Sequence, residues 1–201
     1  HVSLSIARGE CHALMGENIY SDTDGRYLGM DGRIHEVTAP QRIQYSTFSG
    51  WDVYRSQLQL LTLLAPEVGG DIAQSLLNQA SQSGGEWDRW THNAGITHVM
   101  NADPAAPAIA YILAFGGRSF DVEAAYRSLR KAATVPTAHD LSREGCPVEC
   151  VGERPSLDKW LALQYIPVGA NAWGPAAETL EDATADFAIS ELARRMGDEA
   201  T

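Results

Sequence analysis

Cysteine, basic charge and long apolar runs are all scarce in this sequence of 201 residues. Three cysteines are too few to build a disulfide scaffold. The net charge is −11, with 15 Lys and Arg against 26 Asp and Glu, so the chain repels nucleic acid and anionic membrane surfaces. No run of about 18 apolar residues occurs, and we expect no segment to span a bilayer. The sequence therefore predicts neither a nucleic-acid partner nor a membrane partner.

The composition is that of a globular protein. Hydrophobic residues make up 44% and charged residues 20%, which argues against wholesale disorder. Residues 18–33 are rich in Asp, Gly and Tyr, which predicts turns with at most one short strand, around Tyr27. We predict an all-α class in one domain, with a loop-rich lead-in over 1–48 and helical hairpins over 49–201.

Apolar residues at helical spacing predict six helices. The first, from near Ser49 to just before Pro66, is apolar on more than one side, so we expect it to be buried between layers. Asp103 and Asp121 are expected to cap the third and fourth helices, with Pro104 at the first helical position of the third. The six predicted ranges are about 49–65, 70–81, 104–115, 122–132, 157–163 and 175–196.

The sequence gives little reason to expect a metal ligand. Cys146 and Cys150 flank three residues, and a disulfide there would contribute about 2 kcal/mol. The sequence does not decide between a disulfide and two free thiols at these positions. No second Cys/His pair at ligand spacing accompanies them, and the Asp22–Gly25 turn lacks the register of an EF-hand loop.

Two short segments have the residue types of a sugar site. In Ser49–Arg55, the carboxylate of Asp52 can accept hydrogen bonds from sugar hydroxyls, and the indole of Trp51 offers a flat apolar face to a pyranose. Equally, Ser49 and Asp52 can form a capping box around a core tryptophan. In Gly84–Asn93, two tryptophans either line a cleft that has Asp88, Arg89 and Asn93 at its rim, or belong to a packed loop in which Arg89 pairs with a nearby carboxylate. This second segment contains Trp87, Asp88, Arg89, Trp90 and Asn93.

Read in order, these segments match the pattern of a known family. The most specific element is Phe48-Ser49-Gly50-Trp51-Asp52-Val53-Tyr54-Arg55. It is supported by the segments Ile19–Gly32, Gln82–Trp90, Leu163–Pro167 and Thr179–Ile189. From about Cys11 to Asp198, the chain resembles glycoside hydrolase family 92.

The resemblance implies a secreted or periplasmic bacterial enzyme with an N-terminal β-sandwich followed by an (α/α)6 toroid. Family members are calcium-dependent, exo-acting α-mannosidases that release terminal mannose, mostly α-1,2-linked, from mannan or N-glycans with inversion. An inverting enzyme needs one carboxylic acid and one carboxylate base. The family's acid, base and Ca²⁺ ligands lie beyond the last element present here. The resemblance thus implies about half a toroid, with no catalytic residue and no metal ligand in this chain.

The resemblance does imply substrate-binding residues. Trp51 and Asp52 are expected to contact mannose in the pocket, and Arg55 to orient Asp52 by a salt bridge. Trp90 is expected at the pocket rim. At Pro104 the family often carries His, so no sugar contact is assigned there.

Other functional classes stay open. A non-catalytic carbohydrate-binding or protein-interaction module would need a closed core within this chain. Another (α/α)6 enzyme, such as a trehalase-like hydrolase, would need an acid/base pair that we do not find. Under the family interpretation the chain alone hydrolyses nothing, and its open apolar flanks associate or are covered by the rest of the parent.

Overall fold

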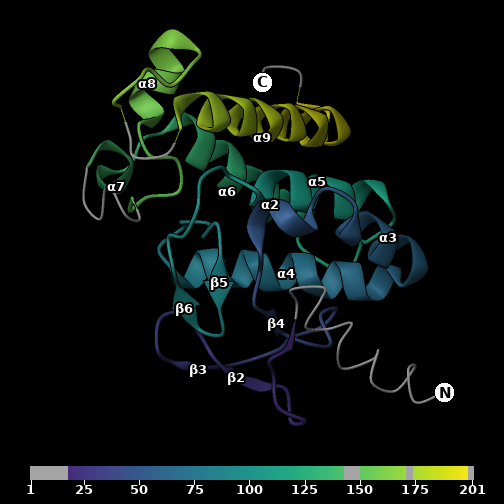
Figure 1. The fold of residues 1–201 in the computed structure, drawn as a ribbon. Coiled ribbons are helices and arrows are strands. Elements are labelled where there is room, and N and C mark those ends of the chain that lie inside the picture. Colours follow the sequence, from purple (N-terminus) through teal and green to yellow (C-terminus); the bar gives the residue numbers. More distant parts are fainter. Residues whose placement is uncertain (1–17, 143–149, 171–173, 199–201) are drawn as a thin grey trace, which may run out of the picture.

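Helices dominate the computed structural model, which describes residues 18–142, 150–170 and 174–198 (Figure 1). The helices are α2 (Gly50–Val53), α3 (Gln57–Leu64), α4 (Pro66–Gln82), α5 (Ala105–Ala114), α6 (Val122–Thr134), α7 (Ala138–Leu141), α8 (Leu157–Leu163) and α9 (Pro175–Met196). The predicted all-α class is confirmed. None of the described helices is long and apolar enough to cross a membrane.

The strands are short and form three antiparallel pairs. The pairs are β1 (Asn18–Ile19) with β4 (Tyr45–Ser46), β2 (Arg26–Leu28) with β3 (Ile34–Glu36), and β5 (Thr91–His92) with β6 (Gly95–Ile96). The predicted strand around Tyr27 is β2. The other strands have only two or three residues each, which is too short for an alternation pattern to be recognised in the sequence.

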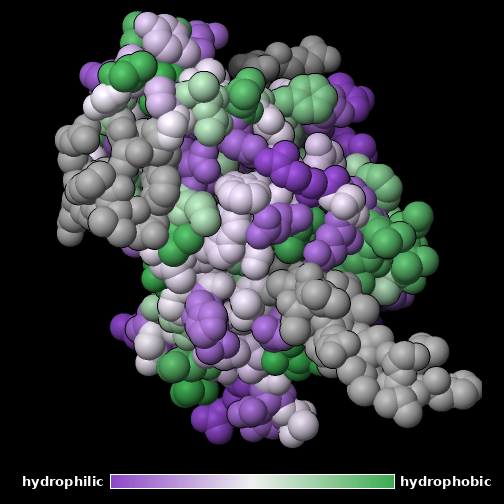
Figure 2. All heavy atoms as spheres, in the orientation of Figure 1, coloured by the Kyte–Doolittle hydropathy of each residue, from purple (hydrophilic) through white to green (hydrophobic). Residues whose placement is uncertain are grey.

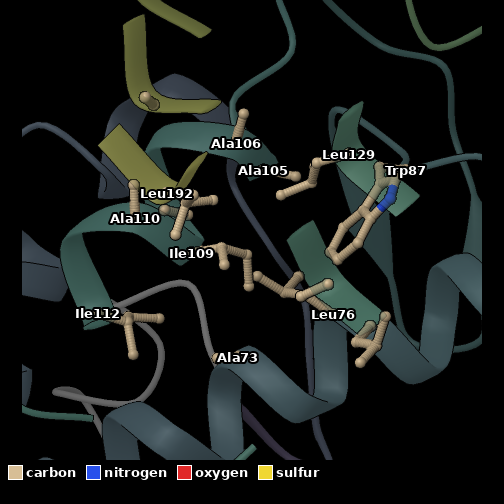
Figure 3. Close-up of a cluster of buried hydrophobic side chains, with 14 of the residues drawn as sticks. Ala73, Leu76, Trp87, Ala105, Ala106, Ile109, Ala110, Ile112, Leu129 and Leu192 are labelled. Carbon is tan, nitrogen blue, oxygen red and sulfur yellow. The ribbon is translucent and has the colours of Figure 1, made fainter. Parts of the chain in front are cut away.

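Helix α5 is the centre of the fold and lies between α4 and α9 (Figure 1). It is buried on nearly every side because alanines at 105, 106, 108 and 110 let neighbouring helices approach closely. Ile109 and Ile112 fill the remaining space and are fully buried. Figure 3 shows side chains of α4, α5, α6 and α9 meeting in this cluster. The core therefore depends on segments far apart in the sequence.

Helix ends largely follow the predicted signals. Asp121 caps α6 by accepting a hydrogen bond from the N–H of Ala124 at 2.8 Å. Helix α4 starts four residues before the predicted Gly70, because Pro66 takes the first position, where a missing N–H costs nothing. Helix α5 begins at Ala105, with Pro104 in the preceding position already in a helical conformation. Helices α8 and α9 have the predicted bounds.

The first predicted helix is wrong in two respects. It is divided into α2 and α3 by a turn over 54–56, and α4 follows directly. The helix was also expected to be buried between layers, but within this chain three leucines of α3 are 59–75% exposed: Leu60, Leu63 and Leu64. In Figure 2 hydrophobic spheres cover the end of the molecule where Figure 1 places α3. The opposite face of α3 packs inward through Leu58, which is fully buried.

Helix α9 has one buried stripe and one exposed stripe. Ala185, Ile189 and Leu192 are buried, whereas Leu180 and Phe187 are 69% and 63% exposed. Exposed apolar side chains of this size on two helices are unusual for a free-standing surface. Of the cysteine pair, Cys146 lies outside the described residues, and Cys150 is buried and disulfide-bonded.

Candidate functional site

Three of the four predicted substrate-binding residues are joined by side-chain contacts, and the fourth adjoins them in the sequence. We call the group the aromatic patch. Its members are Trp51, Asp52, Tyr54, Arg55, Trp90 and Glu181. The rings of Trp51 and Trp90 meet edge to face, with centroids 5.2 Å apart and planes at 77°. This is a favoured aromatic geometry, and it brings together two tryptophans 39 positions apart in the sequence.

Gly50 permits this contact. Its φ is +28°, and a Cβ at this position would lie 2.3 Å from Cζ3 of Trp90. The backbones of Ser49 and Trp90 are joined by an antiparallel bridge, which sets the distance between the two segments. A side chain at position 50 would therefore displace the Trp90 ring.

Arg55 does not pair with Asp52, contrary to the prediction. Its NH2 donates to Oε1 of Glu181 at 2.5 Å, and the guanidinium lies 5.9 Å from the Trp51 ring centroid and 5.1 Å from that of Tyr54. The hydrogen bond to Glu181 is the main reason why the pKa of Arg55 is raised, and attraction to Asp52 is a smaller one. The carboxylate partner comes from α9, which sequence proximity gives no means of identifying.

Glu181 is the patch residue that sequence reasoning missed. Its Oε2 accepts a hydrogen bond from the hydroxyl of Tyr54 at 2.6 Å, and its side chain is 17% exposed. Burial, reinforced by this hydrogen bond, raises the pKa of Tyr54. The only sequence signal was that Glu181 falls inside one of the family-like segments. The structure places a half-buried carboxylate, held by two donors, against Tyr54 and Arg55.

Asp52 is exposed, and no hydrogen bond to its carboxylate exists within the described residues. Ser49 occupies the N-cap position of α2 but makes no side-chain cap hydrogen bond. The capping-box alternative for Asp52 is therefore not realised. A solvated carboxylate without an internal partner is able to accept hydrogen bonds from a ligand.

The segment around Trp87 is packed in the core and is not a cleft wall. Trp87 is 2% exposed, and its indole N–H donates to Oγ of Ser128 at 3.0 Å. Arg89 is 1% exposed and donates to the carbonyls of Gly152 and Cys150 at 2.5 and 2.6 Å. Of the two tryptophans, only Trp90 reaches the patch, because the buried residues alternate with it along the segment.

Asp88 also has a structural role. Its carboxylate accepts from the N–H groups of Thr97 and His98 at 2.8 and 3.1 Å, so it fixes the chain just after the β5–β6 hairpin. Burial raises its pKa, although these hydrogen bonds act in the opposite direction. Asp88 and Arg89, which were expected at the rim of a cleft, thus bind backbone groups of neighbouring loops.

A second group of charged residues is buried inside the molecule. We call it the ionic network; its members are Arg89, Asp103, Asp140, Glu153, Arg154, Glu178, Asp182 and Asp186. All are buried except Asp186, whose side chain is 42% exposed. Arg154 is its centre and is 1% exposed. Its Nε donates to Asp103 at 2.9 Å and its NH1 to Asp186 at 2.6 Å. Burial lowers the pKa of Arg154, but the carboxylates of Asp103, Asp182 and Asp186 raise it by more.

The aromatic patch faces solvent through Asp52 and Arg55, which are exposed, whereas Tyr54 is buried. Cavities of about 590, 720 and 420 Å³ are lined by other residues, which include Lys131, Tyr126 and Ile166 respectively. Within the described residues, no group of three or more His, Cys, Asp or Glu side chains is arranged to hold a metal ion. The residues present thus do not fit a Ca²⁺ site, and no chemical step is assigned to such an ion here.

Comparison with known proteins places this geometry in context. A family model described as the glycosyl hydrolase family 92 catalytic domain matches residues 11–201. The comparison with curated proteins finds no match. Among solved structures, the family GH92 α-mannosidase BT3965 from Bacteroides thetaiotaomicron, in complex with mannoimidazole, is 26% identical with a TM-score of 0.76. That match covers 90% of this chain and 21% of the mannosidase.

A second solved structure gives the same picture. The family GH92 inverting mannosidase BT2199 from Bacteroides thetaiotaomicron VPI-5482 is 25% identical with a TM-score of 0.73, over 91% of this chain and 23% of that one. The chain thus spans about a fifth of the length of these mannosidases. Because the family model matches nearly the whole sequence, the chain belongs to glycoside hydrolase family 92 and lies within its catalytic domain.

Proposed function

We propose that this chain supplies part of the mannose-binding pocket of an inverting, exo-acting α-mannosidase, with preference for α-1,2-linked terminal mannose of mannan or N-glycans. The observation that carries the proposal is the aromatic patch. It combines a free carboxylate on Asp52, an indole pair and a carboxylate on Glu181 that is held by two donors. Hydroxyl-accepting carboxylates beside a flat apolar face are suited to a pyranose.

In this proposal the residues divide the work of binding. Asp52 bridges two adjacent mannose hydroxyls, and Trp51 with Trp90 forms the wall against the sugar's C–H face. Arg55 orients Glu181 instead of Asp52, and Glu181 accepts from a further hydroxyl. The catalytic acid, the base and the Ca²⁺ ligands come from other parts of the parent.

The exposure of Asp52 and Arg55 supports a shared pocket. A sugar site is normally concave and surrounds most of its ligand, and the cavities of about 590 and 720 Å³ among the described residues are lined by residues outside the patch. We propose that residues 1–201 form part of one helical domain, and that the rest of a secreted or periplasmic parent, including a β-sandwich, closes the pocket. The exposed leucines of α3 and the exposed stripe of α9 are then buried against the parent.

Saturation-transfer NMR with methyl α-mannoside tests this proposal, because the method detects the weak binding expected of half a pocket. We expect transfer to the sugar with the wild-type chain, and its loss in Asp52→Asn and in Trp51→Ala. Methyl α-glucoside, which differs at one hydroxyl, is the matched ligand control. Equal transfer to both sugars in all variants would contradict the proposal.

A hydrolysis assay separates the proposal from its main alternative. With Ca²⁺ and an aryl α-mannoside, we expect no turnover by this chain alone, because it lacks the acid and the base. Turnover would show that a complete catalytic centre is present and would overturn the division of roles proposed above. Binding of a protein or another glycan without any mannose binding would instead favour an interaction module.

A further inference from the structure

Helix α9 carries residues of both the aromatic patch and the ionic network within one turn. Glu178 and Asp182 are 0% and 1% exposed and lie in the network, whereas Glu181, between them, reaches Tyr54 and Arg55. We propose that Glu178 and Asp182 are positioning residues for the candidate sugar pocket. Buried as neutral side chains, they hold the first half of α9 in place, and with it Glu181. The inference rests on the proposed function.

The surroundings of Glu178 favour its neutral form. The charged groups that face it are Arg89, from the segment before β5, Arg154, from the segment before α8, and Asp182 of its own helix. The amide of Asn101 and the N–H of Ala102 approach it from the segment before α5, but neither carboxylate oxygen has a hydrogen bond of normal geometry. A carboxylate in such a dry position is costly unless it is well solvated by donors.

Asp182 lies one helical turn further along α9. It faces Arg154 together with three other carboxyl groups, those of Asp103, Glu178 and Asp186. Its Oδ1 has no hydrogen-bond partner within the described residues. One guanidinium therefore faces several carboxyl groups. Its Nε and NH1 donate to Asp103 and Asp186, and its NH2 lies 2.9 Å from Asp103 without a hydrogen bond of normal geometry.

Charge balance across the network points the same way. Five buried carboxyl groups face two buried guanidiniums; the seven residues are Asp103, Asp140, Glu153, Glu178 and Asp182, with Arg89 and Arg154. Two cations cannot neutralise five anions in a medium of low dielectric constant, so part of the carboxyl groups must hold a proton. Burial raises the pKa of Glu178 to about 7, against the attraction of Arg89. Burial likewise raises the pKa of Asp182 well above its usual range.

The sign of the pH effect follows from these directions. The pKa of Glu178 is about 7 in the folded chain and near 4.5 in an unfolded one, so protonation favours the folded state. Its contribution to stability is complete below about pH 4.5 and is lost as the pH rises through about 7. We expect the first half of α9 to loosen in that range and to draw Glu181 away from Tyr54 and Arg55.

Urea unfolding of the whole chain between pH 4.5 and 8 tests the energetic part. Glu178→Gln keeps a neutral side chain at every pH. Relative to this variant, the unfolding equilibrium constant of the wild type should rise roughly 100-fold over the range, as expected for one carboxyl group with this difference in pKa. Glu191→Gln, on the exposed face of the same helix, is the matched control and should keep the wild-type profile. Parallel profiles for the wild type and Glu178→Gln would overturn the inference.

Hydrogen exchange tests the positional part and uses no sugar, so its failure is distinguishable from failure of the proposed function. From pH 5 to 8, after correction for intrinsic rates, amides in residues 178–185 of the wild type should open at least tenfold more often, while α4 stays unchanged. The increase should be absent in Glu178→Gln, and in Asp182→Asn should the first variant fold poorly. Equal changes in amide opening in α4 and α9, or the same increase in both variants, would contradict a local effect of Glu178 and Asp182 on α9.

Discussion

The aromatic patch and the ionic network use the same residue types in different surroundings. Each pairs an arginine with acidic side chains: Arg55 with Glu181 in the patch, and Arg154 with Asp103 and Asp186 in the network. The Arg55 side chain is 54% exposed, however, and that of Arg154 is 1% exposed. Water screens the first pair, whereas the second must satisfy its charges internally.

This difference in exposure suits the patch to ligand binding and the network to holding segments of the chain in position. The patch leaves Asp52 free to bind a ligand, because solvation keeps an unpaired carboxylate inexpensive. In the network, the hydrogen bonds of the Arg154 side chain hold three segments together: the turn before α5, residues 150–156 and helix α9. Removal of its central residue should therefore cost far more stability than removal of the corresponding residue of the patch.

Arg154→Ala should give the largest effect. It leaves Asp103 buried without its cation and frees Asp186, so we expect the free energy of unfolding to fall by about 3–5 kcal/mol. Urea denaturation at pH 7 measures it. Since small domains are stable by only about 5–15 kcal/mol, partial unfolding at room temperature is expected. A loss below about 1 kcal/mol would mean that the network contributes no more than a surface pair.

Gly50→Ala should have an intermediate effect within the patch. The new Cβ collides with the Trp90 ring, and relief of such a collision costs about 1–3 kcal/mol. Near-ultraviolet circular dichroism should lose the signal of the Trp51–Trp90 pair, and mannose binding should weaken. Gly84→Ala is the matched control, because its φ is also positive but a Cβ there meets nothing within 4 Å. An unchanged tryptophan spectrum in Gly50→Ala would contradict the contact.

Arg55→Ala should have the smallest effect on stability. A solvent-exposed ion pair contributes about 0–1 kcal/mol, so the unfolding midpoint should hardly move. Saturation transfer to methyl α-mannoside should nevertheless decrease, because Glu181 loses one of its two donors. Arg127→Ala, which removes the exposed ion pair with Glu123, should match its stability but keep sugar transfer. If Arg55→Ala lowered the free energy of unfolding nearly as much as Arg154→Ala, the patch and the network would not differ in their contribution to stability.

Much of the local structure was readable from the sequence. Asp121 as a cap, Pro66 as a boundary and the extent of α9 follow from short-range rules, since each concerns neighbours within one helical turn. The division of the first predicted helix at residues 54–56 was not readable, because an apolar stripe continues across it. The turn places Tyr54 and Arg55 against α9, a contact between residues about 126 positions apart.

For the site, the sequence identified residue types but not their partners. Trp51 and Trp90 were singled out separately, and their contact depends on the bridge at Ser49 and on the absence of a side chain at Gly50. Trp87 and Arg89 looked like cleft residues of the same kind as Trp90, yet they are core residues. No local pattern distinguishes an indole that faces water from one that faces Ser128.

The sequence alone determined the all-α class, the main helix boundaries and the family, because spacing, caps and motif order are properties of the chain read along its length. Only the tertiary structure decided which carboxylate meets which arginine, and which tryptophan is exposed. Those outcomes depend on which groups lose contact with water. That is decided by segments that approach one another through space: α9 with α5, and residues 150–156 with Trp87 and Arg89. A carboxyl group is thus exposed to solvent at Asp52 and fully buried at Glu178.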